Sequence, residues 1–316
     1  MSKHATLLSL LLIFAPPQLG WAQETLKLPK LVLPSLKSYA PSNSTATKAA
    51  TNLRELTLAA KLSEDGDLIE NGIVWRIFKP DASDDGKLPM IATANGGTTR
   101  FALVPGSYLV HAGFGRAGIT KRISVGTDAR EEVLVLDAGG LKLNAVLSGG
   151  VRIPSDKLRF SIYAGEEPEN GERPLILPDV KPDDIVRLNA GTYHVVSNYG
   201  SVNATIRADL VVEAGKLTEA NVEHKAADLT LKLVREEGGE AMADTAWSVL
   251  NPSGEVIKES VGAFASMVLA EGDYVIIAKN KEKLYQREFT AVAGRNQDVE
   301  VVAAQPAATP VNAQEP

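Results

Sequence analysis

The side chains that most often perform acid–base, nucleophilic or metal chemistry are scarce in this sequence. It contains no cysteine and four histidines. His4 falls in the leader described below, and His111, His194 and His224 occupy non-equivalent places in the repeats of the chain. This spacing supports neither a zinc site nor a Ser-His-Asp triad, so we expect isolated histidines at the surface or at strand edges. The sequence therefore predicts no catalytic centre, no metal site and no cofactor.

Residues 113–118 have the spacing of a dinucleotide-binding motif, Gly-x-Gly-x-x-Gly. That motif binds pyrophosphate only where a strand leads into a helix, whose N-terminus faces the phosphates. The residues that follow here alternate between apolar and polar types, which indicates a strand instead. We therefore expect a glycine-rich hairpin loop. It would present Phe114 and Arg116, with Lys121 and Arg122 nearby, as contacts for a small anion or an acidic partner.

A second motif resembles the start of a calcium site. Asp81, Ser83, Asp85 and Gly86 follow the opening spacing of an EF-hand loop, in which the twelfth position is a bidentate Glu. The twelfth position here is Ala92. A solvated acidic loop is the preferred interpretation, and calcium binding by an acidic loop stays open.

The elements that must position these side chains recur three times along the chain. A Gly-x-Tyr segment recurs at Tyr108, Tyr193 and Tyr274. An aromatic residue recurs earlier in each unit, as Trp75, Phe160 and Trp247. Because a position that recurs on an alternating strand most simply faces the core, we expect these rings to be buried. Each tyrosine hydroxyl should reach a backbone partner.

Within each unit, apolar and polar residues alternate in short runs that are bounded by Gly, Pro, Asn and Asp. This period of two predicts strands with one buried face. About seven short strands per unit predict a β-sandwich. We therefore expect an all-β chain of three tandem immunoglobulin-like or prealbumin-like β-sandwich repeats, at residues 54–139, 140–227 and 228–304.

One strand carries a family resemblance. The segment Pro105-Gly106-Ser107-Tyr108-Leu109-Val110-His111-Ala112 resembles the Pro-Gly-x-Tyr-x-Val-x-Ala strand of prealbumin-like sandwiches. These include the regulatory domain of carboxypeptidases and the B-type repeats of bacterial surface proteins. The second and third units lack the proline. The resemblance implies the sandwich fold and a non-catalytic role in adhesion, spacing or binding.

The two ends of the chain differ from the repeats. Residues 1–22 have a basic start, a short apolar run and small residues at a cleavage site, so we expect a signal peptide. Residues 23–53 should form a Pro/Ser/Thr-rich arm and linker, in which Leu31 and Leu33 are candidate partner contacts. Residues 305–316 should be a disordered tail. The apolar run of residues 1–22 is too short to span a membrane, and no second apolar stretch follows it, so we expect no transmembrane segment.

Charge and targeting narrow the choice of partners. The chain has 33 basic and 39 acidic residues, for a formal net charge of −6. That balance disfavours nucleic acid, because phosphate backbones bind basic surfaces. We expect a non-catalytic binding or structural protein of the cell envelope, periplasmic or alternatively secreted or on the cell surface. Its partner should be another envelope or extracellular protein.

Two alternatives from other classes stay open. A carbohydrate-binding accessory protein would expose a strip of aromatic rings, for which Phe114, Tyr163, Tyr199 and Tyr285 are the candidates once the repeated tryptophans are assigned to the core. A hydrolase would need converging carboxylates in a cleft at a domain junction. The sequence indicates neither the identity of the partner nor the oligomeric state.

Overall fold

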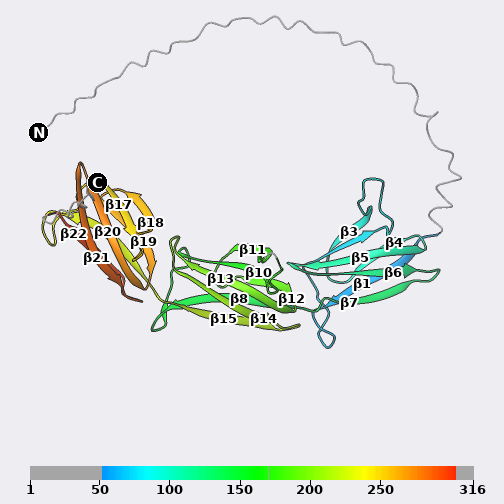
Figure 1. Cartoon of the computed structure of the whole chain (residues 1–316). Helices are drawn as coiled ribbons and strands as arrows, with labels where there is room; N and C mark the ends of the chain where they lie inside the picture. The colour runs from blue at the N-terminus through cyan, green and yellow to red at the C-terminus, as the bar shows by residue number, and fades with distance from the viewer. Residues whose placement is uncertain (1–51, 170, 304–316) are drawn as a thin grey trace, which may run out of the picture. The chain divides into compact units, whose positions relative to one another are not determined.

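The computed structural model describes residues 52–169 and 171–303, and within these ranges every regular element is a β-strand. The strands of these ranges follow one another along the chain without an intervening helix (Figure 1). They form six sheets, which enclose three hydrophobic cores. The all-β class and the sandwich repeats expected from the sequence are confirmed. In this part of the chain, no helix is long and apolar enough to cross a membrane. The expected signal peptide, the arm up to residue 51 and the tail lie outside the described residues.

The first sandwich contains seven strands. They are β1 (Arg54–Lys61), β2 (Ile73–Phe78), β3 (Met90–Gly96), β4 (Thr99–Leu103), β5 (Gly106–Phe114), β6 (Ala117–Val125) and β7 (Arg130–Val135). β1 lies between β4, to which it is antiparallel, and β7, to which it is parallel. The facing sheet has the order β3-β2-β5-β6, and all its neighbours are antiparallel.

The second sandwich repeats this arrangement with one short additional strand. Its strands are β8 (Ala138–Leu147), β9 (Val151–Arg152), β10 (Leu158–Ala164), β11 (Leu175–Val180), β12 (Ile185–Asn189), β13 (Gly191–Tyr199), β14 (Thr205–Val212) and β15 (Leu217–His224). The sheets have the orders β12-β8-β15 and β11-β10-β13-β14, and β9 pairs with β8. β8 is again antiparallel to one neighbour and parallel to the other.

The third sandwich has the same topology. Its strands are β16 (Ala226–Val234), β17 (Thr245–Leu250), β18 (Val256–Val261), β19 (Phe264–Ala270), β20 (Gly272–Asn280), β21 (Lys283–Ala291) and β22 (Gln297–Val302). They form the sheets β19-β16-β22 and β18-β17-β20-β21. β8 and β16 each begin two residues before the start expected for their unit. Residues 136 and 137 alone separate β7 from β8, and Lys225 alone separates β15 from β16.

The repeated aromatic residue belongs to the hydrophobic core of each sandwich. The exposed fractions of Trp75, Phe160 and Trp247 are 0%, 0% and 1%. The indole N–H of Trp75 donates to the Gly97 carbonyl at 2.9 Å, and that of Trp247 donates to the Gly262 carbonyl at 2.9 Å. A buried indole needs such a partner, because an unpaired buried donor is costly. Phe160 fills the same place without a donor.

Each repeated tyrosine joins the two sheets of its sandwich. Its hydroxyl donates to a carbonyl four residues earlier: Tyr108 to Val104 at 2.7 Å, Tyr193 to Asn189 at 2.8 Å and Tyr274 to Ala270 at 2.8 Å. The accepting residues lie at or just after the end of an edge strand of one sheet, whereas the tyrosines lie near the start of a central strand of the other. The bond thus fixes the corner where the chain changes sheets, as a tyrosine corner does.

Three expectations about exposure are corrected. Tyr199 and Tyr285, candidates for solvent-facing rings, are 1% and 6% exposed. His224, expected to be isolated at the surface or at a strand edge, is also buried. Its Nε2 lies 2.8 Å from the Ser197 hydroxyl, and its ring meets that of Tyr199 edge-on. Because Ser197 satisfies its polar nitrogen, this histidine can occupy an inward-facing position at the end of β15.

Candidate functional site

The Gly-x-Gly-x-x-Gly segment forms a tight hairpin, as the strand that follows it predicts. β5 ends at Phe114 and β6 begins at Ala117, so Gly115 and Arg116 make the turn. Gly115 has a φ of 68°. A Cβ atom at this position would lie 2.9 Å from the Cβ of Arg187 in β12. Because the conformation and the close approach both favour glycine, the turn can lie directly against the second sandwich.

Hydrogen bonds join this turn to the second sandwich. The Arg116 N–H donates to the Arg187 carbonyl at 3.0 Å. The Asn189 side chain accepts from the Gly118 N–H at 3.1 Å and donates to the Leu136 carbonyl at 2.8 Å. Because an amide side chain donates and accepts at once, Asn189 binds both β6 and the short segment between β7 and β8.

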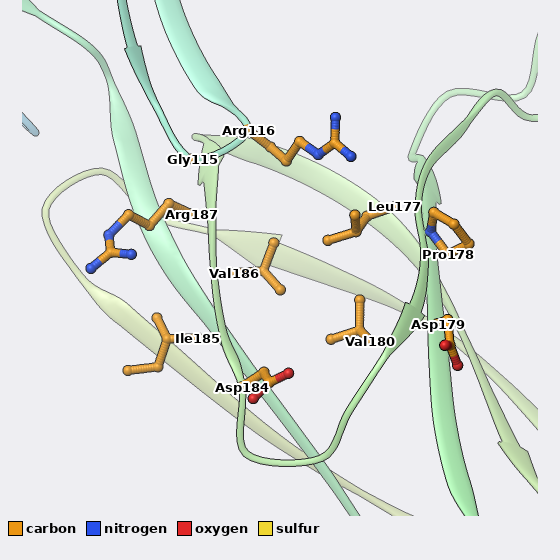
Figure 2. Close-up of a pocket in the computed structure, with 10 residues that line it drawn as sticks. All are labelled: Gly115, Arg116, Leu177, Pro178, Asp179, Val180, Asp184, Ile185, Val186 and Arg187. Atoms are coloured by element: carbon orange, nitrogen blue, oxygen red, sulfur yellow. The ribbon is translucent and has the colours of Figure 1, made fainter. Parts of the chain in front are cut away.

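The two loop residues singled out in the sequence have different surroundings. The guanidinium carbon of Arg187 lies 4.4 Å from the centre of the half-buried Phe114 ring, in cation–π contact. Phe114 therefore contacts the chain's own second sandwich. Arg116 is exposed, and its side chain extends away from that of Arg187 (Figure 2). The other two candidate contacts, Leu31 and Leu33, lie outside the described residues.

A hollow of about 540 Å³ opens beside the turn (Figure 2). Its floor is apolar, because Leu177 and Val180 of β11 and Val186 of β12 point toward its middle. Val180 and Val186 belong to the core of the second sandwich. β11 and β12 are edge strands of the two sheets. The hollow therefore lies between the sheet edges, with the turn of the first sandwich beside it.

The rim of this hollow carries charges of both signs. Arg116 extends along one side, and Asp179 and Asp184 lie on the others. Asp179 also forms an ion pair with Arg159 at 3.0 Å. Ile185, which is 52% exposed, adds an apolar side chain at the rim. An apolar floor with a few polar groups around it is typical of binding sites for ligands and for protein side chains.

A second hollow of about 380 Å³ lies on the β2 and β5 side of the same turn. Arg76, His111 and Arg116 line it, so Arg116 lines both hollows. The Nδ1 atom of His111 lies 3.0 Å from the Thr120 hydroxyl oxygen. Burial, with a smaller effect of the Arg76 charge, lowers the pKa of His111. The sequence had indicated basic residues near this loop but had not indicated Arg76.

The other side chains that could act in catalysis or bind a metal lie apart from one another. His194 Nδ1 lies 2.7 Å from an Asp209 carboxylate oxygen, away from the other two histidines on different strands. Across residues 52–169 and 171–303, no three His, Cys, Asp or Glu side chains gather as metal ligands would. In the acidic loop that resembles an EF-hand start, Asp85 accepts a hydrogen bond from the Lys87 N–H at 3.1 Å.

Sequence reasoning missed Arg187 and Asn189, the residues that hold the junction. The bond between Gly118 and Asn189 joins residues 71 positions apart, and no local spacing rule covers such a distance. One weak signal exists. Asn189 lies four residues before Tyr193, at the place that Val104 and Ala270 take in the other units, so a polar residue there departs from the repeat.

Comparison with known proteins gives one family match. Residues 228–303, which form most of the third sandwich, match the family model of the Rhizobiales growth-associated tandem repeat domain. No curated protein matches the sequence.

Several solved structures are similar to this chain. The Bacillus anthracis TIE protein is 16% identical, with a TM-score of 0.22 over 81% of this chain and 51% of its own. The minor pilin GBS52 of Streptococcus agalactiae is 14% identical, with a TM-score of 0.29 over 54% and 95%. BcpA, the major pilin subunit of Bacillus cereus, is 11% identical, with a TM-score of 0.21 over 79% and 99%.

The chain thus matches about half of the TIE protein and nearly the whole of both pilins. Identities of this size concern the fold alone. The expected resemblance to β-sandwich repeats is confirmed, since the paired sheets repeat along the chain and the third sandwich matches a tandem-repeat family.

Proposed function

We propose that this chain is a non-catalytic, exported protein of the cell envelope that acts through contacts with another protein. The periplasm is the proposed compartment, and secretion or the cell surface is the alternative. The observation that carries the proposal is the hollow between β11 and β12. Its apolar floor fits an apolar side chain presented by a partner, since such anchors in desolvated pockets supply most of the energy of protein interfaces.

The rim of the hollow favours a protein partner. Arg116 and Asp184 carry opposite charges at this rim, so a partner with complementary charges would be oriented as it docks. Ile185 would extend the apolar contact beyond the hollow itself. A surface that combines these features binds selectively without any catalytic group.

The neighbouring strands suggest how a partner would lie. β11 pairs with β10 with register shifts and contains Pro178, and a proline cannot donate to an added strand. β12 contains no proline and receives one hydrogen bond from Arg116. Exposed sheet edges readily accept a further strand. Because the turn of the first sandwich already lies against Arg187, a partner segment would lie along the start of β12, beside Ile185, and place one apolar side chain in the hollow.

The third sandwich offers a further contact surface. At the turn between β18 and β19, Val261 is 78% exposed and Phe264 is 59% exposed. Large apolar side chains at such exposure favour association. This sandwich is also the part that matches the Rhizobiales growth-associated tandem repeat domain.

The test compares two variants with matched exposure. Ile185→Asp places a charge at the rim of the hollow, and Leu284→Asp places one at a 50% exposed site on β21 of the third sandwich. The tagged proteins are used to capture partners from an envelope extract, and thermal melting shows that each is folded. We expect one defined protein that the wild type and Leu284→Asp retain and Ile185→Asp loses. Equal capture by all three, or turnover of a substrate by the purified protein, would contradict the proposal.

A further inference from the structure

The second hollow beside the β5–β6 turn is a cationic pocket that shares Arg116 with the first hollow. Arg76 comes from β2, His111 from β5 and Arg116 from the turn, and Asn189 of β12 closes one side. Among the described residues that line it, none is an aspartate or a glutamate. The pocket therefore gathers positive charge without a negative side chain of its own.

Neither Arg76 nor Arg116 has an ion-pair partner among the described residues. The arginines that do form ion pairs there are Arg100, Arg130, Arg152, Arg159 and Arg173. Their neighbour Lys121 differs, since it pairs with Glu132 at 3.1 Å. The chain as a whole carries more acidic than basic residues, with a net charge of −6. Two unpaired guanidinium groups in one hollow create a local positive potential that attracts an anion.

Glycines make room for this pocket. Gly113 and Gly118 face each other across β5 and β6. A Cβ atom on Gly113 would lie 3.3 Å from His111 Nε2, and one on Gly118 would lie 3.0 Å from His111 Cε1. The equivalent pairs in the other sandwiches are Asn198 with Thr205 and Lys279 with Leu284. The imidazole therefore lies over two positions that carry side chains elsewhere in the chain.

The cationic pair is also confined to the first sandwich. Arg76 on β2 lies opposite His111 on β5. The equivalent pairs are Ser161 with Val196 in the second sandwich and Ser248 with Ile277 in the third. Only the first of the three sandwiches has an arginine and a histidine at these two positions, so the fold itself does not require them.

We propose that this pocket binds an oxyanion group, a carboxylate or a phosphate, through Arg76 and Arg116, which line it, with His111 as a further donor. Guanidinium groups present parallel N–H donors that match the oxygens of both anions. When the Thr120 hydroxyl donates to Nδ1, the neutral His111 ring carries its proton on Nε2, and that N–H is available to the anion. The inference holds whether or not the neighbouring hollow binds a protein.

The histidines of the chain provide the assay. Proton NMR resolves imidazole signals, and the signal that disappears in His111→Val belongs to the pocket. Sodium phosphate and sodium glucuronate are titrated separately into the full chain, with sodium chloride at equal ionic strength as the control. We expect a saturable shift of the His111 signal with at least one of the two oxyanions. The signals of His194 and His224 should not follow it.

Matched variants separate binding from a general charge effect. Arg76→Ser introduces the serine that both other sandwiches have at this place, and it should weaken binding roughly tenfold or more, as expected for a lost charge-assisted bond. Arg122→Ser removes a charge from β6 outside the pocket lining and should leave the affinity unchanged. Saturation by phosphate alone or by glucuronate alone identifies the oxyanion. A His111 signal that moves no more than in chloride, or unchanged affinity in Arg76→Ser, would overturn the proposal.

Discussion

Replacing Asn189 by alanine should loosen the junction between the first two sandwiches. The two shortest hydrogen bonds of the side chain accept from the Gly118 N–H at 3.1 Å and donate to the Leu136 carbonyl at 2.8 Å, and its Nδ2 also lies 3.3 Å from the Gly118 carbonyl. Both partners belong to the first sandwich or to the segment that follows it, so the loss affects the contact between sandwiches. Alanine has no polar atom with which to replace either bond.

The size of the effect follows from these two bonds. A neutral hydrogen bond contributes about 1 kcal/mol net to stability, so losing both should cost about 2 kcal/mol at this half-buried site. That corresponds to roughly a thirtyfold higher population of the opened junction. The Arg116–Arg187 backbone bond and the Phe114–Arg187 contact remain in the variant, so part of the junction is kept. Asn189 belongs to none of the three hydrophobic cores, so the sandwiches themselves should stay folded.

Hydrogen exchange measured by mass spectrometry reports this opening directly, because the Gly118 amide itself donates to Asn189. Peptides from β6 should exchange faster in Asn189→Ala, whereas peptides from β21 should not change. Asn144→Ala is the matched control, since Asn144 bonds to Asp183 at 3.1 Å within the second sandwich. Unchanged exchange in β6, or the same acceleration in Asn144→Ala, would show that Asn189 does not hold the junction.

Two further predictions concern the cores. Trp247→Phe introduces the residue that the second sandwich has at this place, but it removes the indole hydrogen bond to the Gly262 carbonyl and leaves unfilled space. It should therefore destabilise the third sandwich by about 2–3 kcal/mol, measured by circular dichroism as a lower urea midpoint. An unchanged midpoint would show that the indole adds no stability. Burial lowers the pKa of His224 below its usual 6.5 in the folded chain. The unfolded chain therefore binds a proton at His224 more readily than the folded chain does. The stability that neutral His224 contributes is complete above pH 6.5 and is lost as the pH falls. His111 shifts in the same direction, so urea unfolding between pH 7.5 and pH 5 should be compared in a His111→Val background. In the His111→Val background, the free energy of unfolding should fall less between pH 7.5 and pH 5 when His224 is replaced by Gln. An equally large fall with and without His224→Gln would contradict the prediction.

Much of the fold follows from local sequence patterns. Alternation of apolar and polar residues over short runs predicts strands, because successive side chains of a strand face opposite sides. The recurring Trp75 and Trp247 positions predict core residues for the same reason, and their exposed fractions are 0% and 1%. The tyrosine bonds were also within reach, since a Gly-x-Tyr turn places the ring at a corner of the sandwich.

The junction was not within reach of local patterns. Asn189 and Arg187 act on residues of another sandwich, and their residue types on an exposed edge strand look like ordinary solvated positions. His224 misled for a related reason, because its partner Ser197 lies on a strand of the facing sheet. Whether a polar residue is buried depends on such distant partners.

The most direct test of the proposed function is photo-crosslinking in living cells. A photoreactive amino acid is placed at position 185, at the rim of the hollow, or at position 284 on β21 as the control. We expect one discrete adduct with another envelope protein from position 185 and none from position 284. An absence of adducts from position 185, or the same adducts from both positions, would contradict it.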